Sequence, residues 1–280
     1  MGICKSVKAG VVIAIAALAC TPAAWADDPP PSDPCAGIPN CTVGPPGSPQ
    51  PTPPNPCAPQ PDCMPPRPIR EVLSKPGQVS RWAFVTKRAV VRKQPKPGAK
   101  TVARLRLKTQ DGTDELVMVM ERVTDSHGRR WVRVRLPILP NNTTGWVPQE
   151  TLGGFHRVRT WLRIDTKHLR ATLVRSGRVV FRAHVGVGQK RWPTPKGEFF
   201  IRDRLEGFKP NGMYGPLAFG LNARSAVLTD WPGGGFVGVH GTNAPYLLPG
   251  RVSHGCIRMR NHDILRLGRL MPVGTPVTIK

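Results

Sequence analysis

The chain has 280 residues, of which 39% are hydrophobic, so one or two domains with a packed core are feasible. Its 33 prolines and 29 glycines are too many for a uniformly globular chain and are unevenly spread, which indicates a disordered segment. The formal net charge is +24, from 41 basic and 17 acidic residues. Such a charge suits nucleic acid, an anionic membrane surface or an anionic wall polymer. The basic residues are scattered, however, and lack the interleaved aromatic residues that single-strand binders use.

Residues 1–26 have the layout of a secretory signal peptide. Two lysines precede the apolar run Ala9–Ala19, and small residues stand at the expected cleavage site after Ala26. This run is well short of the ~20 residues that span a bilayer, so we expect no transmembrane helix in the mature chain. We expect export to the periplasm or cell wall, where anionic cell envelope polymers are suitable partners and nucleic acid is not. A lipidated Cys20 is the alternative, although the residues before it make a poor lipidation box.

Residues 27–79 are predicted to be a disordered linker rich in proline and cysteine. Proline recurs every two or three residues over most of this stretch, and little is apolar enough to be buried. Two cysteine pairs follow the same spacing, first Cys35 and Cys41, then Cys57 and Cys63. An exported chain favours disulfides, within or between the pairs, over four unpaired thiols. The sequence leaves their connectivity open.

Residues 80–153 show short alternating runs separated by turn signals, which predict a small β-barrel or sandwich. The runs include Ala89–Arg92, Leu116–Met120 and Trp131–Arg135. Their order, followed by Gly145–Val147, resembles a bacterial SH3-like domain. The resemblance implies a binding module, commonly for wall peptides, and a purely structural spacer is the alternative.

Residues 157–280 form a second predicted β-rich unit with one short helix. A hairpin that turns at Ser176-Gly177 should have two apolar strand faces. These faces are Leu169, Ala171 and Leu173, then Val179, Phe181, Ala183 and Val185. Further strands are expected at Gly197–Leu205, Leu217–Ala223, Phe236–His240 and Pro276–Lys280. Asn261 is the expected N-cap of a helix to Leu270 that buries Ile264, Leu265 and Leu267.

The residues that carry chemistry lie in His240-Gly241-Thr242 and in the run from Ser253 to Met259. Two of the seven cysteines lie in the predicted signal peptide and four in the linker, which leaves Cys256 without a pairing partner. A thiol attacks a carbonyl only as thiolate, so Cys256 needs a neighbouring imidazole. His240 ends a predicted strand and Cys256 follows a loop, so two adjacent strand ends can bring them together. His254 competes, but neighbours at i and i+2 place their side chains in parallel and align poorly. We favour His240 as the base and His254 as a group that supports it or orients the substrate.

Two further residues near the cysteine fit this chemistry. Gly255 allows a sharp turn before the nucleophile, so that the N–H groups of Gly255 and Cys256 can face a developing oxyanion. Arg258 lies on the same side as Cys256 in an extended run and can hold a substrate carboxylate in a two-point fork.

These residues resemble the catalytic motif of L,D-transpeptidases of the YkuD type: a His-Gly element, then Ser-His-Gly-Cys with an apolar residue, Arg and an apolar residue. Gly186-Val187-Gly188 and the run Thr194–Phe199 resemble that family's upstream strand and Thr-Pro-x-Gly-x-Phe turn. The resemblance covers about residues 160–280. It implies a mainly β fold, in which an SH3-like small barrel precedes a YkuD-type β-sandwich with a short helix.

The resemblance also implies a peptidoglycan reaction. Cys256 would be acylated by the third residue of a donor stem peptide, typically meso-diaminopimelate, with release of D-Ala. A neighbouring stem's amine would then resolve the thioester into a 3→3 cross-link. His240 would be the base, held by the carbonyl of Gly241. Ser253, His254 and Gly255 would shape the oxyanion site and Arg258 would bind a carboxylate; no metal or cofactor is implied.

Other interpretations remain. The same acyl-enzyme would serve an L,D-carboxypeptidase or an enzyme that attaches proteins to the wall. A wall-binding module that has lost activity, or an inert buried Cys256, is the alternative from another class. A sortase-like transpeptidase fits poorly, because Ser253-His254-Gly255 does not match the Thr-Leu-x-Thr that sortases place before their cysteine.

Overall fold

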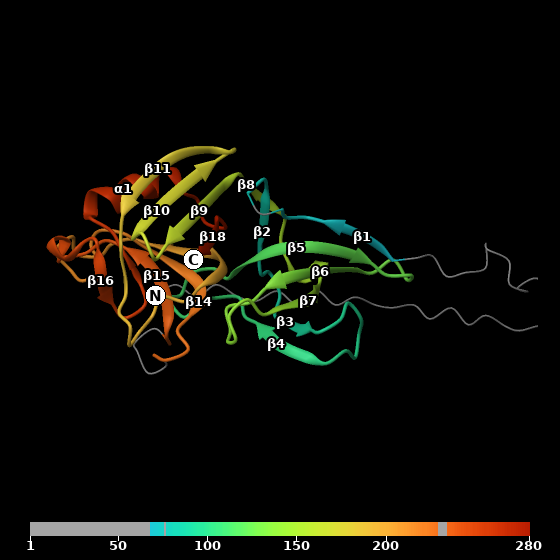
Figure 1. Cartoon of the computed structure of the whole chain (residues 1–280). Helices are drawn as coiled ribbons and strands as arrows, with labels where there is room; N and C mark the ends of the chain where they lie inside the picture. The colour runs from blue at the N-terminus through green and yellow to red at the C-terminus, as the bar shows by residue number, and fades with distance from the viewer. Residues whose placement is uncertain (1–67, 76, 229–233) are drawn as a thin grey trace, which may run out of the picture. The chain divides into compact units, whose positions relative to one another are not determined.

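The computed structural model describes residues 68–75, 77–228 and 234–280 (Figure 1). All of them belong to one compact unit. The predicted signal peptide, most of the predicted linker and its four cysteines lie outside the described residues.

The first part of the described chain is an antiparallel β-sheet. Its elements are β1 (Ile69–Val72), β2 (Ser80–Phe84), β3 (Ala89–Arg92), β4 (Thr101–Leu105), β5 (Leu116–Thr124), β6 (Arg130–Arg135), β7 (Thr144–Pro148), the 3-10 turn η2 (Gln149–Thr151) and β8 (His156–Val158). In the described chain the strand order is β4-β3-β7-β6-β5-β2-β8, with β1 paired to β5. Alternate residues such as Val91, Val119 and Val134 are fully buried in one core. In β5 the other face is covered too, because Met118 is buried in a separate cluster. The predicted β structure of this region is confirmed, and its SH3-like character stays a prediction.

Both ends of this first sheet lie outside the range predicted for it. Strand β1 pairs with β5 and Leu73 is buried, so ordered structure begins well before residue 80. Strand β8 pairs with β2 and therefore extends the first sheet past residue 153. Polar residues fill most of β1 and β8, so these short strands carry no clear apolar alternation and are held by backbone pairing.

The second part of the described chain forms a larger sheet and one α-helix. Its elements are β9 (Thr160–Asp165), β10 (Arg170–Arg175), β11 (Arg178–His184), β12 (Gly186–Gly188), β13 (Gly197–Leu205), β14 (Ala218–Arg224), β15 (Phe236–His240), η3 (Pro245–Leu247), β16 (Gly250–Ser253), β17 (Ile257–Arg258), α1 (Asn261–Leu270) and β18 (Pro276–Ile279). Among the described strands the order is β11-β10-β9-β18-β13-β14-β15-β17-β12-β16. The pairs β9–β18, β15–β17 and β12–β16 are parallel, and the other pairs along this path are antiparallel.

This larger sheet curls around a single core. Phe181 of β11 and Val187 of β12 stand near opposite ends of the strand order, yet both belong to one buried cluster with Phe219 of the central strand β14. The cluster also takes Ile264 and Leu267 from α1. The mainly β fold with a short helix is therefore confirmed; the predicted sandwich is one continuous sheet in the described residues, folded over its own core (Figure 1).

Helix α1 has the predicted length but differs at two residues. Its N-cap is Arg260, with no side-chain cap bond, and not Asn261. The Asn261 side chain instead accepts a hydrogen bond from the N–H of Thr242. Leu265 was expected to be buried but is 42% exposed, because it faces away from the side that Ile264 and Leu267 share. No helix in the described ranges is long and apolar enough to cross a membrane.

The hairpin of β10 and β11 turns at Ser176 and Gly177 as predicted, both with positive φ. Val179 was placed on the apolar face, but it is 44% exposed. The reason is a register shift beside Leu173 and Val174, which puts Val179 out of phase with the buried Phe181.

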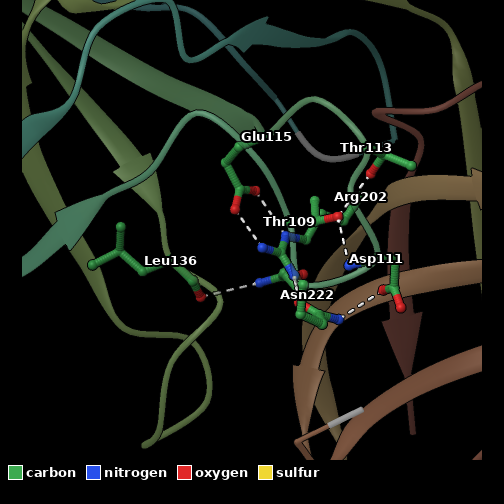
Figure 2. A network of polar contacts seen from close by, with 8 residues as sticks. Thr109, Asp111, Thr113, Glu115, Leu136, Arg202 and Asn222 are labelled. Carbon is green, nitrogen blue, oxygen red and sulfur yellow. Dashed lines mark hydrogen bonds and ion pairs between the residues drawn. The ribbon is translucent and has the colours of Figure 1, made fainter.

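A loop before β5 is joined to the second sheet by buried polar contacts (Figure 2). Glu115 accepts hydrogen bonds from Nε and a terminal nitrogen of Arg202, and both side chains are about 5% exposed. Arg202 also donates to the amide oxygen of Gln110 at 3.0 Å. A little apart, Asn222 donates to the carbonyl of Leu136 at 3.3 Å. These contacts bring the segment before β5 and the end of β6 against β13 and β14.

Candidate active site

Two neighbouring parallel strands position the predicted nucleophile and base. Val239 of β15 pairs with Ile257 of β17, and His240 pairs with Arg258. Val239 and Ile257 are fully buried in the core. Because side chains alternate along a strand, His240 and Cys256 face the opposite side of the sheet. The sequence placed these residues on separate strand ends, and the register brings those ends side by side.

The His240 ring is held in one tautomer. Its Nδ1 lies 2.6 Å from the carbonyl oxygen of Gly241. A carbonyl only accepts, so Nδ1 carries the proton and Nε2 keeps a lone pair. Burial lowers the pKa of His240 to about 4, and Arg258 adds to this effect, against the opposing bond to Gly241. The imidazole is therefore neutral at neutral pH and able to accept a proton.

The Cys256 thiol is also neutral at rest. Burial raises its pKa, opposed by a hydrogen bond from the N–H of Gly238 at 3.4 Å and by the charge of Arg258. The sequence argument expected an imidazole that makes the thiolate. The structure instead combines a neutral thiol with a neutral imidazole.

Ser253 fixes the turn before Cys256. Its fully buried hydroxyl donates to the carbonyl of Cys256 at 2.6 Å and accepts from the N–H of Gly255 at 3.1 Å. Gly255 has φ +115°, which L side chains rarely adopt, so the predicted need for glycine is confirmed. The Gly255 N–H was a predicted oxyanion donor, but here it is bonded to Ser253, which leaves the Cys256 N–H as the predicted donor.

Close packing fixes the loop that orients His240. A Cβ on Gly241 would lie 2.5 Å from the Asn261 side-chain oxygen and 3.0 Å from Pro216. The same oxygen accepts the Thr242 N–H at 2.9 Å. The start of α1 thus holds the Gly241 carbonyl in place, a contact that the helix prediction alone did not include.

The upstream motif supports the same region. The hydroxyl of Thr194 accepts the Gly188 N–H at 2.8 Å. A Cβ on Gly188 would be 2.2 Å from the carbonyl oxygen of Trp192, so only glycine fits there. The Trp192 ring in turn packs against His254, with ring centroids 4.1 Å apart. His254 is therefore oriented by an aromatic neighbour that the sequence argument missed.

Most of the predicted site residues meet in one cavity of about 90 Å³, which we call the arginine cavity. It is lined by Met213, Tyr214, Ser225, Leu228, Gly235, Phe236, Val237, His240, Ser253, His254, Cys256 and Arg258. Gly241 and Gly255 do not line it. The buried Nε of Arg258 has no hydrogen-bond partner among the described residues.

Aromatic residues from a loop and from the start of a strand complete the cavity. Tyr214 packs its ring edge-on against His240, with centroids 5.0 Å apart. It comes from the irregular segment 206–216. Phe236 stands at the start of β15. Neither carries a motif, so only the fold identifies them.

Comparison with known proteins agrees with this geometry. Residues 159–279 match the family model of the L,D-transpeptidase catalytic domain, YkuD. The putative L,D-transpeptidase YkuD of Bacillus subtilis is 36% identical over 108 residues, which are 39% of this chain and 58% of that protein. The putative L,D-transpeptidase YqjB of the same organism is 34% identical over 105 residues, 34% of this chain and 56% of that protein.

The chain thus spans little more than half the length of these relatives. Among solved structures, an L,D-transpeptidase from Mycobacterium smegmatis is similar at a TM-score of 0.36 and 16% identity, over 54% of this chain and 90% of that one. From the family match and the curated relatives, residues 159–279 belong to the YkuD family of L,D-transpeptidase catalytic domains.

Proposed function

We propose that the chain is an exported peptidoglycan L,D-transpeptidase, active in the periplasm or cell wall, that forms 3→3 cross-links through a thioester on Cys256. One observation carries the proposal: the Cys256 thiol and a histidine with a fixed, unprotonated Nε2 line the same cavity. The catalytic roles below are assigned on this basis.

The first half-reaction transfers an acyl group to sulfur. Arg258, with its unpartnered Nε, binds a carboxylate of the donor stem. As Cys256 Sγ attacks the carbonyl carbon of the third stem residue, its proton passes to Nε2 of His240. The tetrahedral intermediate then expels D-Ala, whose amine takes that proton, and a thioester remains.

The second half-reaction returns the enzyme to its resting state. The free amine of a neighbouring stem attacks the thioester, a C–N bond forms and the C–S bond breaks. The amine's proton passes through His240 to the departing sulfur. Water in place of the amine would give an L,D-carboxypeptidase, and an amine on a protein would give wall attachment.

We also propose that a basic surface on the first sheet binds anionic cell envelope polymers. Residues 87–108 contain nine lysines and arginines and no aspartate or glutamate. Grooves of about 850 and 750 Å³ flank this segment, and both include Arg88. Binding of the purified chain to wall polymer should weaken steeply with salt; binding that is indifferent to salt would contradict this assignment.

A wall digest tests the catalytic proposal. Purified sacculi are incubated with the chain or with Cys256→Ala, digested to muropeptides and separated by mass. We expect 3→3 dimers with the wild type only. Tripeptides without dimers would indicate the carboxypeptidase. Identical digests from both proteins would support the inactive wall-binding module.

A further inference from the structure

A second cavity, of about 190 Å³, reaches the same nucleophile, and we call it the aspartate cavity. It is lined by Gln110, Asp111, Asp203, Leu205, Phe208, Tyr214, Ala218, Phe219, Gly220, Leu221, Phe236, Val237, Gly238, His240 and Cys256. Cys256 and His240 line both cavities. The reacting atoms therefore have two approaches.

The two approaches carry opposite charge. Among the described residues that line the arginine cavity, Arg258 is charged and no aspartate or glutamate is present. The aspartate cavity is lined by Asp111 and Asp203 and by no described lysine or arginine. Basic residues outnumber acidic ones by 41 to 17 in the whole chain, so an acidic cavity is a local exception. The arginine cavity should favour anionic groups and the aspartate cavity cationic groups.

Strand register places the Asp203 carboxylate close to the sulfur. Asp203 pairs with Gly220, and Gly220 pairs with Gly238. Oδ1 of Asp203 accepts the Gly220 N–H at 2.9 Å, and Cys256 Sγ accepts the Gly238 N–H at 3.4 Å. Directly paired residues are about 5 Å apart, so the carboxylate and the sulfur lie over neighbouring strands. Both residues line the aspartate cavity.

Glycine keeps the floor between them open. A Cβ on Gly220 would lie 2.1 Å from Oδ1 of Asp203, and one on Gly238 would lie 3.0 Å from the carbonyl oxygen of Phe219. Glycines inside strands mark places where a ligand or another backbone comes close. Here they leave a trough that runs from the carboxylate to the nucleophile.

Asp203 is buried with one oxygen unused. The residue is 4% exposed, and within the described ranges its Oδ2 accepts no hydrogen bond and forms no ion pair. Burial raises the pKa of this carboxyl, and the charges of Asp111 and Glu115 raise it further against the opposing effects of Arg202 and Gly220. A positively charged ligand would give Oδ2 a hydrogen-bond donor and would offset the repulsion from Asp111 and Glu115.

Asp111 reaches this cavity from the first sheet. Its loop is closed by the Thr109–Thr113 hydroxyl contact at 2.8 Å and by the Asp111 N–H bonded to Thr109 (Figure 2). The Arg202–Glu115 pair fixes the loop against β13. The wall of the cavity is therefore built by both sheets.

We propose that the aspartate cavity receives the acyl acceptor, and that Asp203, assisted by Asp111, binds its ammonium group beside the Cys256 thioester. The inference rests on the proposed function and names the acceptor class as a primary amine on a stem peptide. The bound ammonium first gives one proton to solvent through the Asp203 carboxylate. The free amine then attacks as described above. The donor stem, with its carboxylates, occupies the arginine cavity.

The test separates the two half-reactions. Acyl-enzyme formation from a tetrapeptide stem is followed by intact mass, and cross-linking is then measured against the concentration of a tripeptide stem that ends in meso-diaminopimelate. The variants are Asp203→Asn, Asp111→Asn and the control Asp114→Asn. The amide oxygen that Asp203→Asn introduces still accepts the Gly220 N–H. Asp111 and Asp114 are both exposed residues of one loop, but Asp114 pairs with Lys108 and does not line the cavity.

We expect Asp203→Asn to raise the half-saturating acceptor concentration about tenfold or more, with less than threefold change in the acylation rate. Asp111→Asn should raise it by a smaller factor, and Asp114→Asn should leave it unchanged. Normal acylation with unaltered acceptor dependence in both the Asp203 and Asp111 variants would overturn this inference and leave the proposed function standing. A wild type that forms no acyl-enzyme would overturn the proposed function and this inference with it.

Discussion

Replacing Glu115 by glutamine should destabilise the fold strongly, because its partner is a buried cation. Both side chains of the Arg202–Glu115 pair are about 5% exposed, and Arg202 donates two hydrogen bonds to the carboxylate. Glutamine keeps the shape but leaves the guanidinium charge uncompensated. Breaking a buried pair from one side costs roughly 3 to 5 kcal/mol. For a unit of this size that corresponds to a melting temperature roughly 6 to 20 °C lower.

Urea and thermal unfolding of the full chain measure this effect, with Asp114→Asn as the control for an exposed ion pair. The double variant Arg202→Met/Glu115→Met should recover most of the lost stability, because replacing both charges by apolar side chains is often neutral or stabilising. If the free energy of unfolding of Glu115→Gln lies within about 1 kcal/mol of the wild-type value, the reasoning is refuted. The pair would then contribute no more than an exposed ion pair does.

Further predictions concern the active site. The pKa of His240 falls from 6.5 to about 4 on folding, so the unfolded state takes up its proton first. The free energy of unfolding should therefore drop by roughly 3 kcal/mol between pH 6.5 and 4. Urea titrations should show that His240→Gln lacks this pH-dependent loss. An equal dependence of the free energy of unfolding on pH in both proteins would contradict the assignment. Ser253→Ala removes a buried hydroxyl with two partners and should cost about 1 to 3 kcal/mol, together with slower acylation in stopped-flow assays. A variant with wild-type stability would show that the hydroxyl is dispensable.

The strands and the motif residues were predictable from sequence, because the signals are local. The sequence predicted strands at Gly197–Leu205 and Phe236–His240 with the bounds that the structure has. The need for glycine before Cys256 followed from the sharp turn that the nucleophile requires, and φ at Gly255 agrees. The carbonyl that holds His240 was implied by the family resemblance and is present.

The rest depends on contacts between distant segments, which no local pattern encodes. Glu115 and Arg202 are 87 residues apart and look like ordinary surface charges in the sequence. Asp203 becomes a neighbour of the sulfur only through the register of three strand pairs. The exposure of Val179 follows from a register shift, and the bond to Thr242 assigns Asn261 a role other than the N-cap.

The central claim is that His240 takes the proton of Cys256 as the sulfur attacks. Its most direct test is the rate of acyl-enzyme formation, followed by intact mass with a tetrapeptide stem, in the wild type, Cys256→Ser, His240→Gln and His254→Gln. We predict an adduct on Cys256 that lacks D-Ala, and no adduct in Cys256→Ser. The acylation rate should be at least 100-fold lower in His240→Gln, on the order of a general-base contribution. The rate should fall much less in His254→Gln. A His240→Gln variant that acylates at the wild-type rate, or a greater loss in His254→Gln, would contradict the account.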